Sequence, residues 1–247
     1  MNYIKSKLQQ IFIIISNFIR SLKASSFENK LIETCSKYEF STTSKHYLWN
    51  TLDIFNKVHK NKTQGSMTEC GTEKGIFLIL FQKLVEKYNL KNHKIYGFDT
   101  FQGMAAPTAE DITRNHESMS ERYDKLKIDE ASSNWCYAEI NEVKKNYYEN
   151  TLPNENLILI KGKVEDTLLD SNNIPEKISI LKLDTCLYEG TKIELEKLFP
   201  NVQKGGAIII DNYFNFKGVK KATDEYFVSK LYLIKYYPIV ARAVIYL

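Results

Sequence analysis

The chain has 247 residues, of which 43% are hydrophobic and 26% are charged. This composition is typical of a folded globular protein and excludes disordered and fibrous classes, while the length suits one α/β domain with an extension. The 34 basic and 30 acidic residues give a net charge of +4, and because the lysines are scattered over predicted helix surfaces, this charge does not indicate nucleic-acid binding.

An apolar run from Ile11 to Ile19 stands near the N-terminus, with basic residues on both sides. The run is too short to span a bilayer, which takes about 20 residues, and the residues after it resemble a signal-peptide cleavage site only poorly. We predict an amphipathic helix that packs on the domain or on a second subunit of a homo-oligomer. The alternative is a helix that rests on a membrane surface. The flanking basic residues are Lys5, Lys7, Arg20 and Lys23.

The cysteines show no C-x-x-C spacing and no paired histidine motif, so they indicate neither a zinc site nor a disulfide framework. A reducing compartment suits such a chain best. We therefore expect a cytoplasmic protein, with peripheral membrane contact as the alternative that the N-terminal helix leaves open. The four cysteines are Cys35, Cys70, Cys136 and Cys186.

Apolar residues recur at near-helical spacing from Ser44 to His59, which predicts a second helix leading into the core. We therefore divide the chain into an N-terminal helical extension, residues 1–60, and an α/β domain, residues 61–247. In this domain short apolar runs alternate with helical segments, as in a doubly wound, mostly parallel sheet. The predicted strands are Ser66–Cys70, Lys94–Phe98, Leu157–Lys161, Ile178–Leu183 and Ala207–Ile210, with an edge pair at Leu231–Tyr237 and Ile239–Leu247. The predicted helices are Lys74–Tyr88, Trp135–Tyr148, Tyr188–Phe199 and Lys217–Phe227.

A long irregular stretch, from Thr100 to about Met119, follows the second predicted strand. Loops that leave the C-terminal ends of strands in an open α/β sheet form the ligand crevice, and a loop of this length is more often a lid than a defect. We predict that it covers a ligand.

Acidic residues follow two of the predicted strands beside tight turns. The first strand ends in Thr68–Gly75, which contains Glu69 but lacks the three glycines of a dinucleotide fingerprint, so an oxidoreductase is disfavoured. The second ends at Asp99, whose carboxylate can accept hydrogen bonds from both hydroxyls of a ribose. Two such acids suggest a nucleoside ligand. The alternatives are a turn that merely needs glycine and, for Asp99, a helix cap or turn residue.

Three oxygen-bearing side chains, those of Asp184, Asp211 and Asn212, follow two further strands. Oxygen ligands of this kind suit Mg²⁺, which would keep its remaining positions for water and substrate. Each residue could instead cap the helix after it, but the coincidence of all three favours a metal site.

From about Ser41 to its C-terminus, the chain resembles the macrocin O-methyltransferase family, whose members methylate sugar hydroxyls of macrolides such as mycinamicin and include the novobiocin-sugar enzyme. Ordered blocks carry the resemblance. They are Thr68–Gly71, Phe98–Met104, Pro107–Asp111, Gly162–Leu168, Leu183–Thr185, Leu187–Glu189, Gly205–Gly206, Ile210–Tyr213 and Lys221–Tyr226.

The resemblance implies a class I methyltransferase fold over residues 61–247, with S-adenosylmethionine across the ends of the first two strands and magnesium at Asp184, Asp211 and Asn212. Glu69 and Gly71 would lie near the methionine end and Asp99 on the ribose. The chain departs from its relatives where Cys186 replaces an acid, Gly190 a serine and Asn212 a second aspartate. The implied cofactor-binding residues are Glu69, Cys70, Gly71, Asp99, Thr100, Phe101, Gly162, Lys163, Val164, Glu165 and Asp184.

The implied reaction is an in-line attack of a sugar hydroxyl on the sulfonium methyl group, assisted by magnesium. The sugar could belong to a surface glycan, a nucleotide-sugar or a glycosylated metabolite. Asp184 is the first candidate for the proton acceptor and His116 the second. The alternatives are an enzyme that methylates a catechol-like phenol and a non-catalytic membrane-surface protein on the same fold.

Overall fold

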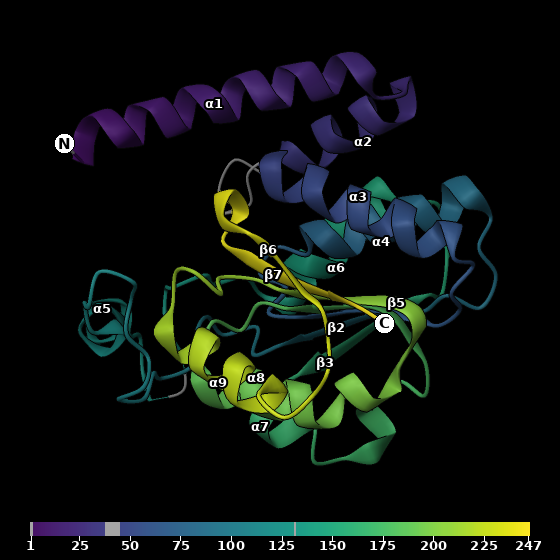
Figure 1. The fold of residues 1–247 in the computed structure, drawn as a ribbon. Coiled ribbons are helices and arrows are strands. Elements are labelled where there is room, and N and C mark those ends of the chain that lie inside the picture. Colours follow the sequence, from purple (N-terminus) through teal and green to yellow (C-terminus); the bar gives the residue numbers. More distant parts are fainter. Residues whose placement is uncertain (1, 38–44, 131) are drawn as a thin grey trace.

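The computed structural model describes residues 2–37, 45–130 and 132–247, which form a seven-stranded sheet between two layers of helices (Figure 1). The strand order is β3-β2-β1-β4-β5-β7-β6, and strands β1 to β5 pair in parallel, whereas β7 is antiparallel to both of its neighbours, β5 and the edge strand β6. The predicted doubly wound α/β fold is confirmed. The strands are β1 Ser66–Cys70, β2 Ile95–Asp99, β3 Leu157–Lys161, β4 Ile178–Leu183, β5 Val202–Ile210, β6 Ile234–Tyr237 and β7 Arg242–Tyr246.

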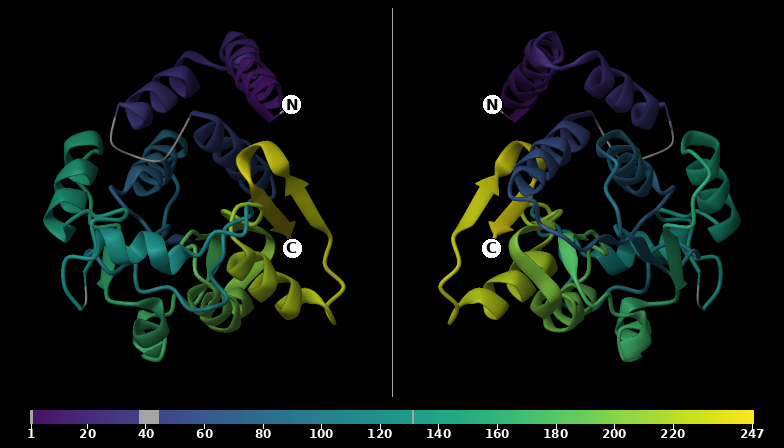
Figure 2. Two further views of the ribbon diagram at one scale, coloured as in Figure 1. Left: turned by 90° about the vertical axis from the view of Figure 1, so that its left-hand side faces the viewer. Right: turned by 90° about the vertical axis from the view of Figure 1, so that its right-hand side faces the viewer.

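Helices cover both faces of this sheet, with α3, α4 and α6 on one face and α7, α8 and α9 on the other (Figures 1 and 2). The central strands β1 and β4 are buried along their whole length, as expected of parallel strands covered on both sides. The helices are α1 Asn2–Lys23, α2 Ser26–Ser36, α3 Lys45–Lys60, α4 Ile76–Tyr88, α5 Met119–Leu126, α6 Ile140–Asn150, α7 Val164–Thr167, α8 Tyr188–Lys197 and α9 Lys217–Phe227.

The N-terminal helices relate to the core in different ways. Helix α3 buries Leu48, Leu52 and Phe55 in the same apolar cluster as residues of β1, β5 and α4, so it helps to form the core. This helix corresponds to the predicted segment Ser44–His59, whose first residue lies outside the described residues. Helix α1 lies apart from the sheet (Figure 1), and none of its residues whose side chains the structure describes belongs to that cluster. Within the part of the chain that the structure describes, no helix is long and apolar enough to cross a membrane.

The edge strands are shorter than predicted, and a turn separates them. Pro238 begins a short 3-10 segment, Pro238–Val240, and Ala241 follows it with a left-handed φ of 50°. The second run therefore loses its first residues, Ile239–Ala241, to the turn, whereas the first run ends at Tyr237 as predicted but begins three residues later, at Ile234. Strands β6 and β7 pair from Ile234 with Ile245 to Tyr237 with Arg242. On its other side β7 pairs with β5, with Ala243 opposite Ile210, so Arg242 lies next to Asp211 at the end of β5.

The predicted lid is an irregular segment that ends at α5 and is tied to the domain by one buried carboxylate. Asp111 accepts hydrogen bonds from the backbone N–H of Thr108 at 2.7 Å and of Tyr188, the first residue of α8, at 2.7 Å. It is only 1% exposed. Asp111 therefore holds this part of the loop against the start of α8.

Candidate active site

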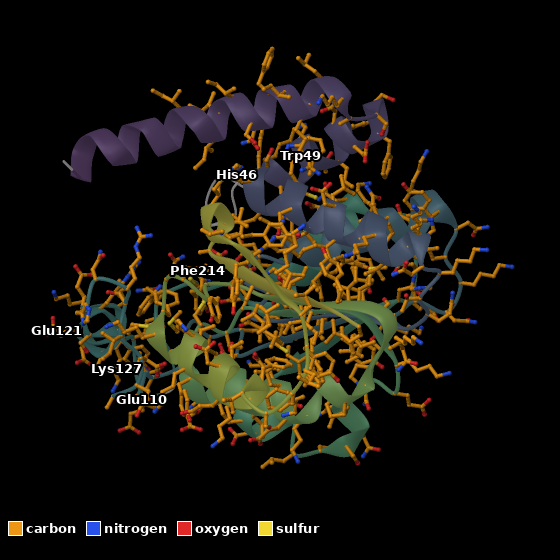
Figure 3. The ribbon with its side chains drawn as sticks, in the orientation of Figure 1. His46, Trp49, Glu110, Glu121, Lys127 and Phe214 are labelled. Atoms are coloured by element: carbon orange, nitrogen blue, oxygen red, sulfur yellow. The ribbon has the colours of Figure 1, made fainter. Side chains whose placement is uncertain are left out.

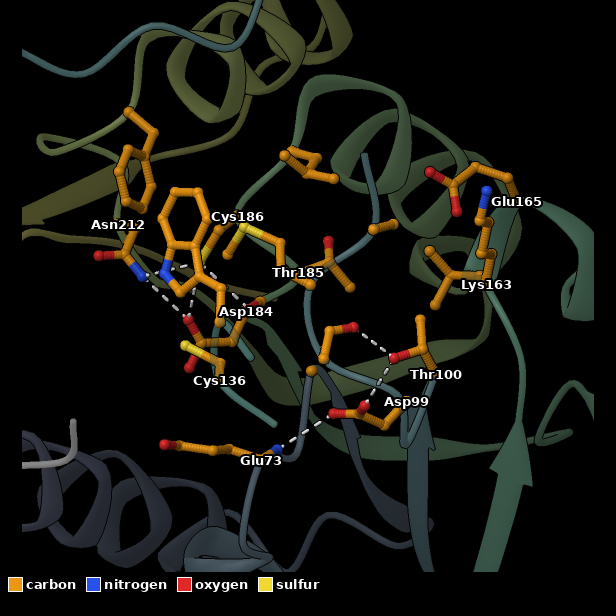
Figure 4. Close-up of a pocket in the computed structure, with 18 of the residues that line it drawn as sticks. Glu73, Asp99, Thr100, Cys136, Lys163, Glu165, Asp184, Thr185, Cys186 and Asn212 are labelled. Carbon is orange, nitrogen blue, oxygen red and sulfur yellow. Dashed lines mark hydrogen bonds between the residues drawn. The ribbon is translucent and has the colours of Figure 1, made fainter. Parts of the chain in front are cut away.

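A cavity lies at the C-terminal ends of the parallel strands, where the strand order reverses between β1 and β4 (Figure 4). Ligands bind at this point in open α/β sheets. Residues from the strand ends form its floor, and residues of the loop after β2 and of α5 form its other side. The lining residues are Gly71, Glu73, Asp99, Thr100, Gly103, Met104, Ala105, Arg122, Trp135, Cys136, Gly162, Lys163, Val164, Glu165, Asp184, Thr185, Cys186, Leu187, Asn212 and Phe216.

The turn after β1 requires glycine at position 71. Gly71 has a φ of 81°, a left-handed conformation that side chains disfavour. A Cβ atom there would also lie 2.5 Å from the carbonyl oxygen of Asp184. The Gly71 N–H donates to the carbonyl of Phe98 at 2.8 Å, so the turn joins the ends of β1 and β2. Because Gly71 has no side chain, the backbone of this turn itself lines the cavity.

The carboxylate of Asp99 accepts hydrogen bonds from the turn after β1 and from the turn after β2. One oxygen accepts the N–H groups of Thr72 at 2.7 Å and Glu73 at 3.1 Å, and the other accepts the N–H of Phe101 at 2.8 Å (Figure 4). Burial raises the pKa of this carboxyl, although these backbone bonds lower it. Asp99 is therefore a turn residue, as the sequence allowed, and it also lines the cavity. Its contact with a ribose stays a prediction.

A buried lysine, Lys182, holds the acids beside the cavity together. Its ammonium nitrogen lies 3.0 Å from Glu69 Oε1, 2.5 Å from Asp184 Oδ2 and 2.8 Å from Asp211 Oδ2, and its side chain is fully buried. Although burial lowers the pKa of Lys182, the surrounding carboxylates raise it above its ordinary value. Burial raises the pKa of Glu69 to about 8, against the lowering influence of Lys182. Lys182 is charged and neutralises part of the cluster.

Asp211 is paired with two cations. Arg242 donates to both of its oxygens, from Nε to Oδ1 and from NH2 to Oδ2 at 2.9 Å, while Lys182 also bonds Oδ2. Although burial opposes it, the charges of Arg242 and Lys182 lower the pKa of Asp211 to about 2. Asp211 is 2% exposed and does not line the cavity.

The structure does not bring the three predicted metal ligands together around one open position. Asp184 and Asn212 do meet, with Asn212 Nδ2 donating to Asp184 Oδ1 at 3.0 Å, but Asp211 is turned to Arg242. Both oxygens of Asp211 are already bonded to cations, Oδ1 to Arg242 and Oδ2 to Arg242 and Lys182, so in this arrangement neither oxygen is free to bind Mg²⁺. Across the described ranges, no group of three His, Cys, Asp or Glu residues could hold a metal ion. The predicted set of Asp184, Asp211 and Asn212 therefore does not fit magnesium.

Most of the residues predicted to bind the cofactor do line the cavity, namely Gly71, Asp99, Thr100, Asp184 and the segment 162–165. Five predicted site residues do not, namely Asp211, described above, and four others. Glu69 contacts Lys182, Cys70 and Phe101 are buried beside the strands, and His116 is an exposed residue that accepts a hydrogen bond from Lys217 at 2.8 Å. His116 is therefore not placed to take a proton from a ligand in the cavity.

Several residues that line the cavity opposite the strand ends were not predicted from the sequence. Arg122 of α5 lies 4.4 Å from the ring centroid of Trp135, and both residues line the cavity with Cys136 and Phe216. Trp135 was predicted to begin a helix, but that helix, α6, starts only at Ile140. Polar turn-forming residues, Ser132, Ser133 and Asn134, precede this tryptophan and were the available signal for a loop.

The chain matches the family model described as Macrocin-O-methyltransferase over residues 19–232. It is 27% identical over 168 residues to the demethyldecarbamoylnovobiocin O-methyltransferase of Streptomyces niveus, covering 67% of this chain and 59% of that protein. It is 24% identical over 162 residues to the mycinamicin III 3''-O-methyltransferase of Micromonospora griseorubida, covering 66% and 60%. The match thus spans about three fifths of each of these relatives. The solved structure of the O-methyltransferase NovP shares the fold, with a TM-score of 0.66, 22% identity and coverage of 80% of this chain and 77% of that chain.

Proposed function

Because the chain belongs to the macrocin O-methyltransferase family, we propose that it transfers a methyl group from S-adenosylmethionine to a sugar hydroxyl. The observation that carries this proposal is the cavity at the strand ends. Gly71, Asp99 and the segment 162–165 line one part of it, where the cofactor would bind, and Asp184 lies beside them. Relatives that are named for methylating glycosylated compounds support a sugar as the acceptor. A surface glycan, a nucleotide-sugar and a glycosylated metabolite all carry such a hydroxyl.

Asp184 is the proposed proton acceptor because it combines access to the cavity with a suitable affinity for protons. Burial raises the pKa of this carboxyl to about 7, against the lowering influence of Lys182, and a base is most effective when its pKa lies near the working pH. S-adenosylmethionine supplies the methyl group as an electrophile. The hydroxyl oxygen forms the new C–O bond as the S–C bond breaks, Asp184 takes the hydroxyl proton, and the products are a methyl ether and S-adenosylhomocysteine. Lys182 positions Asp184 from below.

Magnesium enters no step of this mechanism, because its predicted ligands do not fit it. Titration of Mg²⁺ into the protein saturated with S-adenosylhomocysteine is expected to show no saturable heat, since Lys182 and Arg242 already neutralise Asp184 and Asp211. Methyl transfer is accordingly expected to continue in excess chelator. Saturable Mg²⁺ binding that disappears in Asp211→Asn would show instead that Asp211 turns from Arg242 to the metal.

The cofactor part of the proposal is tested by calorimetry. The wild-type protein is expected to bind S-adenosylmethionine and S-adenosylhomocysteine, whereas Gly71→Val should bind neither, because its side chain would displace the backbone of Asp184 at the turn. Asp170→Ala, at an exposed 3-10 cap remote from the cavity, is the control and should bind normally. Thermal unfolding of both variants shows whether they are folded. A folded Gly71→Val that binds the cofactor like the wild type would contradict the assignment of this turn.

We place this activity in the cytoplasm, on the observation that all four cysteines are free.

A catechol-like phenol is the alternative acceptor. The residues across the cavity from the strand ends, such as Arg122, Trp135 and Phe216, offer it no charged pair for two adjacent phenolic oxygens, and one relative is named for methylating a rhamnosyl-tetracenomycin.

A further inference from the structure

Helix α1 turns its polar side toward the rest of the protein. Asn17 Oδ1 lies 3.1 Å from Nδ1 of His46 on α3, and Arg20 forms an ion pair with Asp53 and lies 5.1 Å from the ring centroid of Trp49. Figure 3 shows His46 and Trp49 on the side of α3 that faces α1. Polar and charged contacts therefore attach α1 to the domain.

The other side of α1 is apolar and exposed. Ile14, Phe18 and Leu22 are 66%, 62% and 69% exposed and recur every four residues, so they lie on one face of the helix. Ile11, Ile15 and Ile19 flank them and are each about half exposed. The stripe is about 16 Å long at 1.5 Å per residue. A surface helix normally directs its apolar face to the core, so this reversed orientation calls for a partner outside the domain.

The charge of α1 distinguishes between the possible partners. Its sequence holds four basic residues and no acidic residue, and because Arg20 is paired with Asp53, the charges of Lys5, Lys7 and Lys23 remain for a partner. If α1 packed against α1 of a second copy, parallel or antiparallel, two helices with only positive charges would lie side by side and repel each other. A surface of anionic headgroups over an apolar interior complements both the charge and the exposed stripe. We propose that α1 lies in the surface of an anionic membrane, with the Ile14, Phe18 and Leu22 face inserted.

Vesicle sedimentation tests this proposal with the full-length protein. The wild type is expected to sediment with vesicles of phosphatidylcholine and phosphatidylglycerol, less with phosphatidylcholine alone, and less at high salt because salt screens the headgroup charge. Leu22→Glu should weaken binding to the anionic vesicles on the order of tenfold or more, because it puts a charge into the inserted face. The control is Leu231→Glu, the same substitution at a leucine that is 106% exposed outside α1, and it should bind like the wild type.

Light scattering without lipid tests the alternative, in which a second copy of the protein covers the apolar stripe of α1. If the wild type is an oligomer that Leu22→Glu converts to monomers, and no vesicle binding occurs, then a second copy covers the stripe and the membrane proposal is wrong. Equal vesicle binding by the wild type and Leu22→Glu would also overturn it. Calorimetry with S-adenosylhomocysteine is expected to give the same affinity for both proteins, so a failure of the methyl-transfer proposal would be seen separately.

Discussion

Replacing Asp184 by asparagine is expected to lower the rate of methyl transfer by about 10²- to 10⁴-fold, the usual contribution of a positioned general base. The substitution keeps the size of the side chain but removes its ability to take a proton. Among the predicted proton acceptors, Asp184 lines the cavity whereas His116 does not. The measurement is the initial rate with saturating S-adenosylmethionine.

Two controls make the result specific. Asp170→Asn applies the same change to an aspartate that caps a surface 3-10 segment, and its rate should equal that of the wild type. Calorimetry with S-adenosylhomocysteine shows whether Asp184→Asn still binds the product, which separates a lost base from a lost binding site. An unchanged rate in Asp184→Asn would mean that another group accepts the proton.

Replacing Arg242 by methionine is expected to lower the free energy of unfolding by about 3–5 kcal/mol, because it removes one of the two cations that pair with the buried carboxylate of Asp211. Arg242 is fully buried and bonds Asp211, the carbonyl of Tyr47 at 2.9 Å and Thr51 Oγ1 at 2.9 Å, so it joins β7 to β5 and α3. Urea unfolding measures the loss.

The matched variant is Arg114→Met, at an exposed arginine of the loop before α5. A surface position of this kind should change the free energy of unfolding by no more than about 0.5 kcal/mol. If Arg242→Met loses less than about 1 kcal/mol, the network around Asp211 is not the stabilising contact that the buried geometry indicates.

The sheet was predictable from the sequence because its strands are short apolar runs separated by helices. Ile178–Leu183 matches β4 at both ends, and Ser66–Cys70 matches β1. Helices α2 and α5 were missed although each follows a Ser-x-x-Glu signal, Ser25 with Glu28 and Ser118 with Glu121, which is typical of a helix start. The capping signal for both helices was therefore present in the sequence.

The ion pairs of the site could not be predicted in the same way, because the acidic and basic residues that pair there come from distant parts of the chain. Asp211 appeared to be a metal ligand from its place after β5, but its partner Arg242 lies at the start of β7, and nothing local connects the two. One signal was present. Lys182 interrupts the apolar run of a central strand, and a buried lysine needs carboxylates around it.

Transfer of a labelled methyl group is the most direct test of the proposed activity. The full-length protein would be incubated with methyl-labelled S-adenosylmethionine and, in parallel, with nucleotide-sugars, free glycans, a glycosylated macrolide and a catechol. Label is expected in at least one sugar-containing acceptor, with an equal amount of S-adenosylhomocysteine, and not in the catechol. Label in the catechol alone, or no transfer to any acceptor by a protein that binds the cofactor, would contradict the proposed sugar O-methyltransferase.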